Sequence, residues 1–276
     1  MIQFPVDPVA IYIGSFQIRW YSIFMALAVL WLIFWSWLQI RKGAKLTNDN
    51  MLTMAIVGIP SGIVFARLLH VFDDIVIQAQ AGQTSAYISN PASIVGGSGL
   101  TIWGAILGAA LSIWIYCKIT KKQTGYLFDV LAPGIIIAQA IGRVGCLLNG
   151  CCYGTPTSLP WAFLYTNPNS LAFGIPPSHP TVIYEILFDI LLFFILLRLR
   201  GKLKPDGALF IVYLSLYSAW RIGDDFLRTG TPFLLGLHEA QFIGLLIVLI
   251  SIPWIIIKMR PADKVKPAAL TNDILS

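Results

Sequence analysis

Long apolar stretches separated by short polar segments dominate the chain from residue 18 to residue 258. Each is close to the roughly 20 residues that a helix needs to cross a bilayer. Backbone exposed to lipid must satisfy its own hydrogen bonds, so we interpret these stretches as transmembrane helices. The pattern predicts an all-α integral membrane protein with seven spans, at residues 18–40, 52–72, 99–118, 127–148, 181–199, 207–227 and 238–258.

The composition supports this interpretation. Of the 276 residues, 57% are hydrophobic and only 12% are charged, whereas about a quarter of the residues of a soluble domain are charged. The first residues, MIQFPVDPVA, lack the basic segment and cleavage site of a signal peptide, so we expect the first span to be retained. Residues 1–276 are predicted to form a single transmembrane domain, with a long loop at 149–180 between the fourth and fifth helices.

The distribution of basic residues predicts the orientation. Fourteen of the 19 lysines and arginines fall in alternate loops and in the C-terminal tail. The positive-inside rule places these loops in the cytoplasm, so the N-terminus and loop 149–180 are predicted to lie outside and the C-terminus inside. The net charge of +6 then reflects topology, and we predict no nucleic-acid partner. The four clusters are Arg41, Lys42 and Lys45; Lys118, Lys121 and Lys122; Arg198, Arg200, Lys202 and Lys204; and Lys258, Arg260, Lys264 and Lys266.

The other five basic residues are all arginines, and the predicted topology places them near the outer leaflet. They are Arg19, Arg67, Arg143, Arg221 and Arg228. Arginines near helix ends often only extend to the membrane surface, and that interpretation stays open for each of them. Several at one level instead favour a site for an anionic headgroup, because guanidinium matches phosphate with two parallel hydrogen bonds.

Two motifs predict local contacts near this level. In GRVGCLLNG, Gly142 and Gly145 are three residues apart and share one helix flank, which favours close helix packing or close approach of a headgroup. In RIGDDFLR, Arg221 and Asp225 are four residues apart and predict an ion pair, with Arg228 further along. This pair can be purely structural, or it can hold an arginine in place for catalysis.

Histidine and cysteine add candidate chemistry. His179, in SHPTVIYE, can act as a general base or have a structural role, and Glu185 suits a buried polar contact. Cys146, Cys151 and Cys152 lie close together in the sequence, but a zinc site usually needs further ligands at regular spacing. A disulfide stays open, and we interpret the cysteines as mainly structural. No metal and no cofactor are predicted.

Several blocks of the sequence together resemble a known family. They are FPVDPVAIYIGSFQIRWYSI (4–23), GGSGLTIWGAILG (96–108), FDVLAPGIIIAQAIGRVGCLLNGCCYG (128–154), HPTVIYE (179–185) and WRIGDDFLR (220–228). In this order they resemble the signature blocks of the bacterial prolipoprotein diacylglyceryl transferases, and GRxGxxxNGxxYG is the most specific of them. The resemblance covers nearly the whole chain.

The resemblance implies an enzyme of the bacterial cytoplasmic (inner) membrane. Such an enzyme moves the diacylglyceryl group of phosphatidylglycerol to the lipobox cysteine of a preprolipoprotein, which is the first step of lipoprotein maturation. Its partners are then phosphatidylglycerol, the lipobox of the signal peptide and the lipid bilayer. No cofactor is implied.

The resemblance also implies roles for individual residues. Arg143 and Arg221 resemble the two essential arginines that bind the headgroup phosphate, and we expect His179 or a water molecule to relay the thiol proton. Arg67, Arg228 and Trp103 are expected to border the substrate. The remaining matched positions are Tyr21 of the WY block, Asp129 before AP, Asn149 and Gly154 of the signature, Asp225 where the family usually has glutamate, and Gln241 at the start of the last helix.

One departure from the family pattern leaves an alternative function open. Trp103 stands where the family often has a histidine proposed as the base, and tryptophan cannot accept a proton. The chain can therefore also be interpreted as a non-catalytic paralogue that binds phospholipid or lipoprotein.

Overall fold

The structure is a computed structural model that describes residues 1–14, 16–80, 82–96, 102–230 and 236–261. The chain divides into two compact units. Unit 1 comprises Met1–Leu32 and Gly125–Ser276, and unit 2 comprises Ile33–Thr124. Helix α1 (Trp20–Arg41) begins in unit 1 and ends in unit 2.

A long helix coincides with each predicted span. They are α1 (Trp20–Arg41), α2 (Asn48–Gln80), α5 (Ile102–Ile119), α6 (Thr124–Asn149), α7 (Thr181–Leu199), α8 (Ala208–Asp224) and α9 (Glu239–Lys258). The largest difference is in α2, which continues to Gln80 instead of ending at residue 72. Residues 99–101 of the third predicted span, and Lys264 and Lys266 of the basic tail, lie outside the described residues.

Four of these helices are long and apolar enough to cross a membrane by length and composition. They are α1, α2, α6 and α9, and Gly104–Ile119 is a shorter apolar helix. The chain is therefore a multi-pass membrane protein. Many large apolar side chains on these helices are exposed in the isolated chain, as helices that face lipid require.

The prediction of an all-α fold was incomplete, because short strands flank the helices. β2 (Val9–Ile13) and β3 (Phe16–Arg19) form an antiparallel hairpin directly before α1. β1 (Ile2–Phe4) pairs in parallel with β4 (Phe163–Tyr165), so the N-terminus is joined to the predicted loop 149–180. Strands this short carry no hydrophobic periodicity long enough to be recognised in the sequence.

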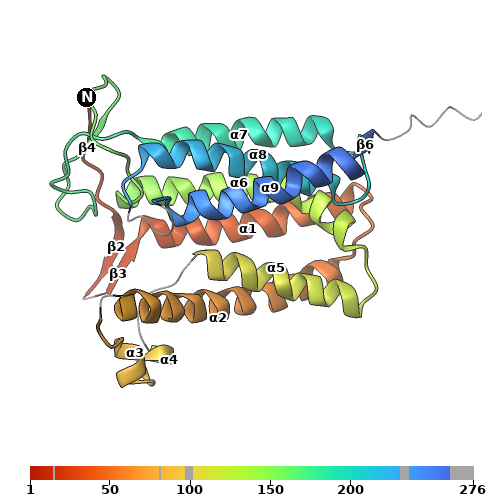
Figure 1. The fold of residues 1–276 in the computed structure, drawn as a ribbon, viewed down its shortest axis with the longest axis horizontal. Helices are drawn as coiled ribbons and strands as arrows, with labels where there is room; N and C mark the ends of the chain where they lie inside the picture. Colours follow the sequence, from red (N-terminus) through yellow and green to blue (C-terminus); the bar gives the residue numbers. More distant parts are fainter. Residues whose placement is uncertain (15, 81, 97–101, 231–235, 262–276) are drawn as a thin grey trace, which may run out of the picture. The chain divides into compact units, whose positions relative to one another are not determined.

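The core of unit 1 lies between three of its helices. Figure 1 shows α6, α7, α8 and α9 side by side, and the buried cluster joins the first three of these. Successive helices run in opposite directions, so the end of α6, the start of α7 and the end of α8 meet at one end of the unit. The core residues are Ala132 and Ile136 of α6, Leu192 and Leu196 of α7, and Leu209 and Tyr213 of α8.

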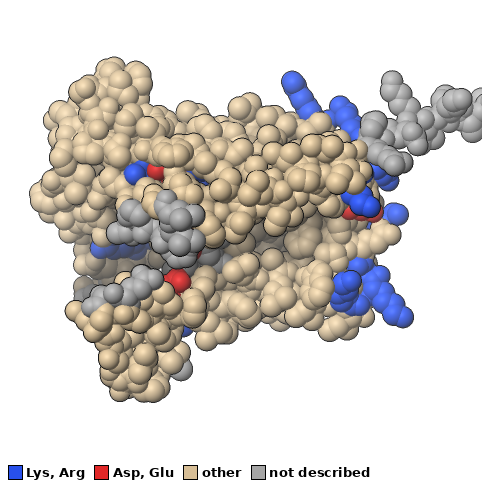
Figure 2. Space-filling model, in the orientation of Figure 1, with Lys and Arg blue, Asp and Glu red and all other residues tan. Residues whose placement is uncertain are grey.

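The opposite end of unit 1 is basic. β5 (Leu203–Lys204) pairs with β6 (Arg260–Pro261), which places Lys204 of the third basic cluster opposite Arg260 of the fourth. In Figure 2 many lysine and arginine side chains of this unit gather at this end, whereas a few lie toward the other end. At the same end, the Asp129 carboxylate accepts hydrogen bonds from the amides of Gly207 and Phe210, at 2.7 and 2.9 Å. Asp129 thereby satisfies amide groups at the start of α8 that have no partner within the helix.

Unit 2 is built on close packing of α2 against α5. Gly62 faces the carbonyl of Ala105, and the hydroxyl of Ser61 donates to the carbonyl of Gly108 at 3.0 Å. The small residues of the segments GIPSG (58–62) and GAILG (104–108) therefore allow the two helices to approach closely. The unit also contains two short helices, α3 (Ala86–Ser89) and α4 (Ser93–Gly96).

Candidate functional site

Glu185 is the ion-pair partner of Arg143. Glu185 lies in the second turn of α7, and its side chain is 0% exposed. Nε of Arg143, near the end of α6, lies 2.8 Å from Oε1 of Glu185, although the geometry is not that of a hydrogen bond. The hydroxyl of Tyr217 donates to the same oxygen at 2.8 Å. A charged arginine within an apolar helix thus has the compensating carboxylate that its position requires.

Arg228 forms an ion pair with the other carboxylate oxygen of Glu185. Its Nη2 donates to Oε2 at 2.7 Å, and its Nε donates to Asp224 at 3.0 Å. The Arg228 side chain is 8% exposed and is held between two carboxylates. Arg143 and Arg228, from separate segments of the chain, are therefore joined by one buried carboxylate.

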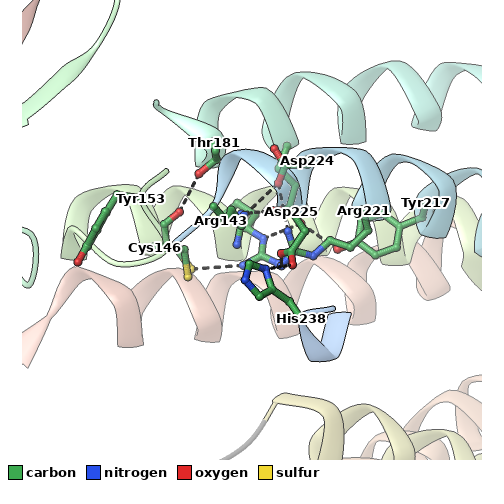
Figure 3. Close-up of polar contacts among 12 residues, drawn as sticks. Arg143, Cys146, Tyr153, Thr181, Tyr217, Arg221, Asp224, Asp225 and His238 are labelled. Carbon is green, nitrogen blue, oxygen red and sulfur yellow. Dashed lines mark hydrogen bonds and ion pairs between the residues drawn. The ribbon is translucent and has the colours of Figure 1, made fainter. Parts of the chain in front are cut away.

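Arg221 extends the network along α8. Its Nη1 lies 3.1 Å from Asp224 and its Nη2 lies 2.9 Å from Asp225, so the ion pair predicted four residues apart is present. Nδ1 of His238 lies 2.7 Å from the second oxygen of Asp225. Figure 3 shows these side chains directed toward one another, and we call Arg143, Arg221, Arg228, Glu185, Asp224 and Asp225 the charge network.

The charges of this network balance, and that decides which donors remain for a ligand. Three guanidinium groups face three carboxylates. Arg143 contacts its carboxylate through Nε, while the one polar contact of its Nη1 within the described residues is with the sulfur of Cys146, at 3.9 Å. The Arg143 side chain is also the most exposed of the three arginines, at 21% against 13% for Arg221 and 8% for Arg228. Among the described residues of the network, Arg143 offers the freest guanidinium edge to an anion.

Arg19 and Asn149 meet at the same end of unit 1. Nη1 of Arg19, at the end of β3, donates to the side-chain oxygen of Asn149 at 3.0 Å. Asn149 is the last residue of α6, two turns after Arg143. The signature asparagine therefore positions a further arginine.

Gly154 lies where backbone segments cross. Its amide donates to the carbonyl of His179 at 2.9 Å, and it forms an isolated bridge with Arg228. A Cβ atom at this position would lie 2.5 Å from the carbonyl oxygen of Leu227 and 2.6 Å from Cβ of His179. Only glycine fits here without displacing the segment that carries Arg228.

His179 adjoins this crossing but contacts no member of the charge network directly in the part of the chain that the structure describes. Nδ1 of its ring lies 3.4 Å from the hydroxyl of Tyr184, which also accepts from the indole of Trp161 at 2.8 Å. The ring is half-buried. Both interpretations of His179, as a base and as a structural residue, are compatible with this position.

Tyr21 and Gln241 approach the network from flanking helices. A Cβ on Gly145 would lie 3.2 Å from Cα of Tyr21, and one on Gly142 would lie 3.6 Å from the sulfur of Met25. Both glycines therefore face α1, which agrees with the close helix packing that their shared flank favoured. The side-chain oxygen of Gln241 accepts from the amide of His238 at 3.0 Å. Gln241 therefore fixes the start of α9, which carries His238 to Asp225.

Asp129, Arg67 and Trp103 are the remaining predicted site residues. Asp129 is fourteen residues before Arg143 on α6, about 21 Å along the helix axis, and it caps α8 at the basic end. Arg67 belongs to unit 2, where it donates to the carbonyls of Ser93 and Ile94, both at 2.7 Å. Trp103 is also part of unit 2, and its side chain lies outside what the structure describes.

The site also contains residues that the sequence analysis did not place in it. Glu185 and Asp224 belong to the charge network, and Tyr217 and His238 contact it. An available signal was the presence of carboxylates within or beside apolar spans, because such groups are rarely tolerated in a membrane unless they are paired. Glu185 was expected only to make a buried polar contact, and its partners were not identified.

Three cysteines lie beside the network. The sulfur atoms of Cys146, Cys151 and Cys152 all lie within 4.8 Å of one another. Hydrogen bonds from the Cys146 and Cys151 thiols, together with the positive charge of Arg143, lower the pKa of the Cys152 thiol. This proximity was not predicted.

A hollow of about 300 Å³ opens on one flank of the network. Its lining is mostly apolar and comes from Tyr184 of α7, from the last turns of α8 and from Leu227, which follows α8. Asp224 is the one charged residue among the described residues that line it. Nε1 of Trp220 and Oδ1 of Asp224 are buried there and have no hydrogen-bond partner within the described residues. None of the three arginines of the network lines this hollow.

Comparison with known proteins gives one consistent result. Relatives named phosphatidylglycerol–prolipoprotein diacylglyceryl transferase include one from Dehalococcoides mccartyi, 46% identical over 96% of this chain and 99% of the relative. One from Clostridium tetani is 35% identical over 90% of this chain and 96% of the relative. One from a Nostoc species is 33% identical over 95% of this chain and 94% of the relative. The sequence model of the family described as prolipoprotein diacylglyceryl transferase matches residues 8–257, which include the whole charge network. The chain therefore belongs to the prolipoprotein diacylglyceryl transferase family.

Proposed function

We propose that this chain transfers the diacylglyceryl group of phosphatidylglycerol to the lipobox cysteine thiol of a preprolipoprotein. It is a transferase of lipoprotein biosynthesis, as its family and its full-length relatives indicate. The observation that carries the site assignment is the convergence of Arg143, Arg221 and Arg228 on buried carboxylates at one end of unit 1.

We assign the headgroup phosphate to Arg143. Its Nη groups face no carboxylate among the described residues, so they can donate two parallel hydrogen bonds to phosphate oxygens. Arg221 and Arg228 are bound more fully by acidic side chains. We expect Arg228 mainly to hold Glu185 in place, and Arg221 to share the charge that develops on the departing glycerol phosphate.

The attacking group is the substrate thiol, which needs only modest activation. An ordinary cysteine thiol, with a pKa of about 8.5, is already partly ionised at neutral pH, and nearby arginines increase the thiolate fraction. The thiolate attacks the diacylglyceryl carbon that bears the phosphate, so a C–S bond forms, the C–O bond to the phosphate breaks and glycerol phosphate leaves. His179 or a water molecule takes the proton, and Tyr21 and Asn149 orient the headgroup.

Topology follows from the same arrangement. We propose seven spans with the N-terminus outside and the C-terminus in the cytoplasm, in the cytoplasmic membrane of a bacterium. The separation of the basic end of unit 1 from the charge network supports this orientation, because the positive-inside rule applies to loop lysines and arginines. Segment 149–180 then lies outside, in a single domain formed by residues 1–276.

The test is lipid transfer to a lipobox peptide by variants of Arg143. Arg143→Ala should lower turnover by about a hundredfold or more, the usual result of removing a donor to a developing anion. Arg143→Lys should restore little of the lost turnover, because an ammonium group cannot make the two parallel hydrogen bonds to the phosphate that a guanidinium group makes. Arg198→Ala, an exposed arginine of the basic end, is the matched control and should retain activity. Unchanged turnover in Arg143→Ala would refute the proposal that Arg143 binds the headgroup phosphate.

The non-catalytic alternative rests on Trp103 alone. Complementation of a bacterium depleted of its own transferase separates the two functions. Growth is expected with the unaltered chain and not with Arg143→Ala. Failure of the unaltered chain, expressed and inserted in the membrane, would favour a binding protein.

A further inference from the structure

The end of α6 gathers three thiols that the proposed reaction does not use. Cys146 lies in the last turn of the helix, and Cys151 and Cys152 follow in the next segment. Their sulfur atoms lie within 4.8 Å of one another. Cys146 is buried, Cys151 is intermediate and Cys152 is exposed, so the cluster is reachable from one side.

The backbone holds this geometry in place. The amide of Cys151 donates to the carbonyl of Cys146 at 3.2 Å, which turns the chain back over the end of the helix. Gly150 adopts a φ of 69°, and Cys152 has a φ of 62°, which is unusual for a residue with a side chain. The hydroxyl of Thr181 donates to the carbonyl of Cys152 at 2.8 Å and fixes this conformation. Backbone strain of this kind persists only where surrounding contacts determine it, and it often marks a functional site.

The distances suit a thiolate-binding cation. Around tetrahedral zinc, with Zn–S bonds of about 2.3 Å, sulfur atoms lie about 3.8 Å apart. The three sulfurs would need to approach by about 1 Å at most, which side-chain rotation about Cα–Cβ can provide. Thiolate ligands select Zn²⁺ and similar soft cations over Mg²⁺ and Ca²⁺.

We propose that Cys146, Cys151 and Cys152 form a binding site for a thiophilic divalent cation of the zinc class. Binding forms three metal–sulfur bonds and releases three protons, so no oxidant or reductant is required. Three thiolates around a divalent cation carry one net negative charge. Nη1 of Arg143, 3.9 Å from the sulfur of Cys146, supplies a neighbouring positive charge (Figure 3). The fourth coordination position is left for water, as in zinc sites with three protein ligands.

Cadmium titration of the reduced, full-length protein in detergent tests this site. Cd²⁺ bound to thiolates gives an ultraviolet charge-transfer band, and bound thiols resist alkylation. We expect one Cd²⁺ per chain, weaker Cd²⁺ binding when excess Zn²⁺ competes, and metal-dependent protection of the exposed Cys152 thiol from alkylation. Cys117→Ser is the matched control, because Cys117 is a buried cysteine of unit 2 outside the cluster. It should leave the stoichiometry and affinity unchanged.

Replacing a ligand should weaken binding strongly. We expect a large loss of Cd²⁺ affinity in each of the variants Cys146→Ser, Cys151→Ser and Cys152→Ser. Loss of a residue that only hydrogen-bonds a metal ligand lowers metal affinity by ~10–100-fold, and loss of a ligand itself should lower it further. Thermal unfolding of each variant without metal identifies any that fail to fold, and the most exposed position, Cys152, provides the safest variant. Equal affinity in Cys152→Ser and the unaltered protein would overturn the proposal. So would a disulfide between cluster cysteines that persists after reduction, or no thiolate band. Because no lipid or peptide is present, these results do not depend on transferase activity.

Discussion

Removing the charge of Glu185 should be among the most damaging single changes in unit 1. Its carboxylate is fully buried and lies 2.8 Å from Arg143 and 2.7 Å from Arg228. Glu185→Gln keeps the shape but leaves two guanidinium groups without their shared counter-charge. Removing one partner of a buried ion pair costs about 3–5 kcal/mol, because the other charge stays buried and uncompensated. We expect a loss of this size in the free energy of unfolding, and a loss of transfer activity as Arg143 loses its position.

Asp189 provides a matched control one helical turn further along α7. It is equally buried, but its only hydrogen bond in the described chain is a long one from Gln139, at 3.4 Å, and its other oxygen has no partner. No described arginine forms an ion pair with it, so Asp189→Asn removes no charge compensation. We expect it to change stability by less than about 1 kcal/mol, because a fully buried acid without a counter-ion is held neutral and asparagine replaces it without a change of charge.

The assay is reversible unfolding in mixed detergent micelles, with lipid transfer measured on the same preparations. The informative quantity is the difference between the two variants, because both remove a buried carboxylate from the same helix. If Glu185→Gln and Asp189→Asn destabilised the protein equally, charge compensation by Glu185 would not explain its position. Retained activity in a stably folded Glu185→Gln variant would refute its role in holding Arg143.

Three further changes test individual positions. Gly154→Ala should destabilise the protein by about 1–3 kcal/mol, because the new methyl group would overlap the carbonyl of Leu227. Gly223→Ala is the control and should not destabilise it, because no atom lies within 4 Å of the new methyl group. Thermal unfolding of both variants measures the difference. Asp129→Ala should cost about 0.5–2 kcal/mol as a lost helix cap while turnover of folded protein is retained, and a selective rise in KM for phosphatidylglycerol would contradict this interpretation. His179→Gln should lower turnover with little change in KM if His179 relays the proton, and full activity in a transfer assay would assign that role elsewhere.

The sequence alone determined the features that depend on neighbours along the chain. Hydrophobic stretches of membrane-crossing length predicted the positions of the long helices, since each helix satisfies its own backbone. The pair Arg221–Asp225 and the shared flank of Gly142 and Gly145 were also predictable, because helical geometry fixes which residues four or three apart lie together. The signature blocks of the sequence indicated the family to which the chain belongs.

Only the tertiary structure decided which distant residues meet. Glu185 is 42 residues from Arg143 and 43 from Arg228, and periodicity within α6 or α7 does not state how the two helices are rotated against each other. The same limit applies to Asp129, which lies on the helix of Arg143 but at its opposite end, where it caps α8. Local physics fixes a helix and its faces, whereas contacts between helices depend on packing that the whole unit determines at once.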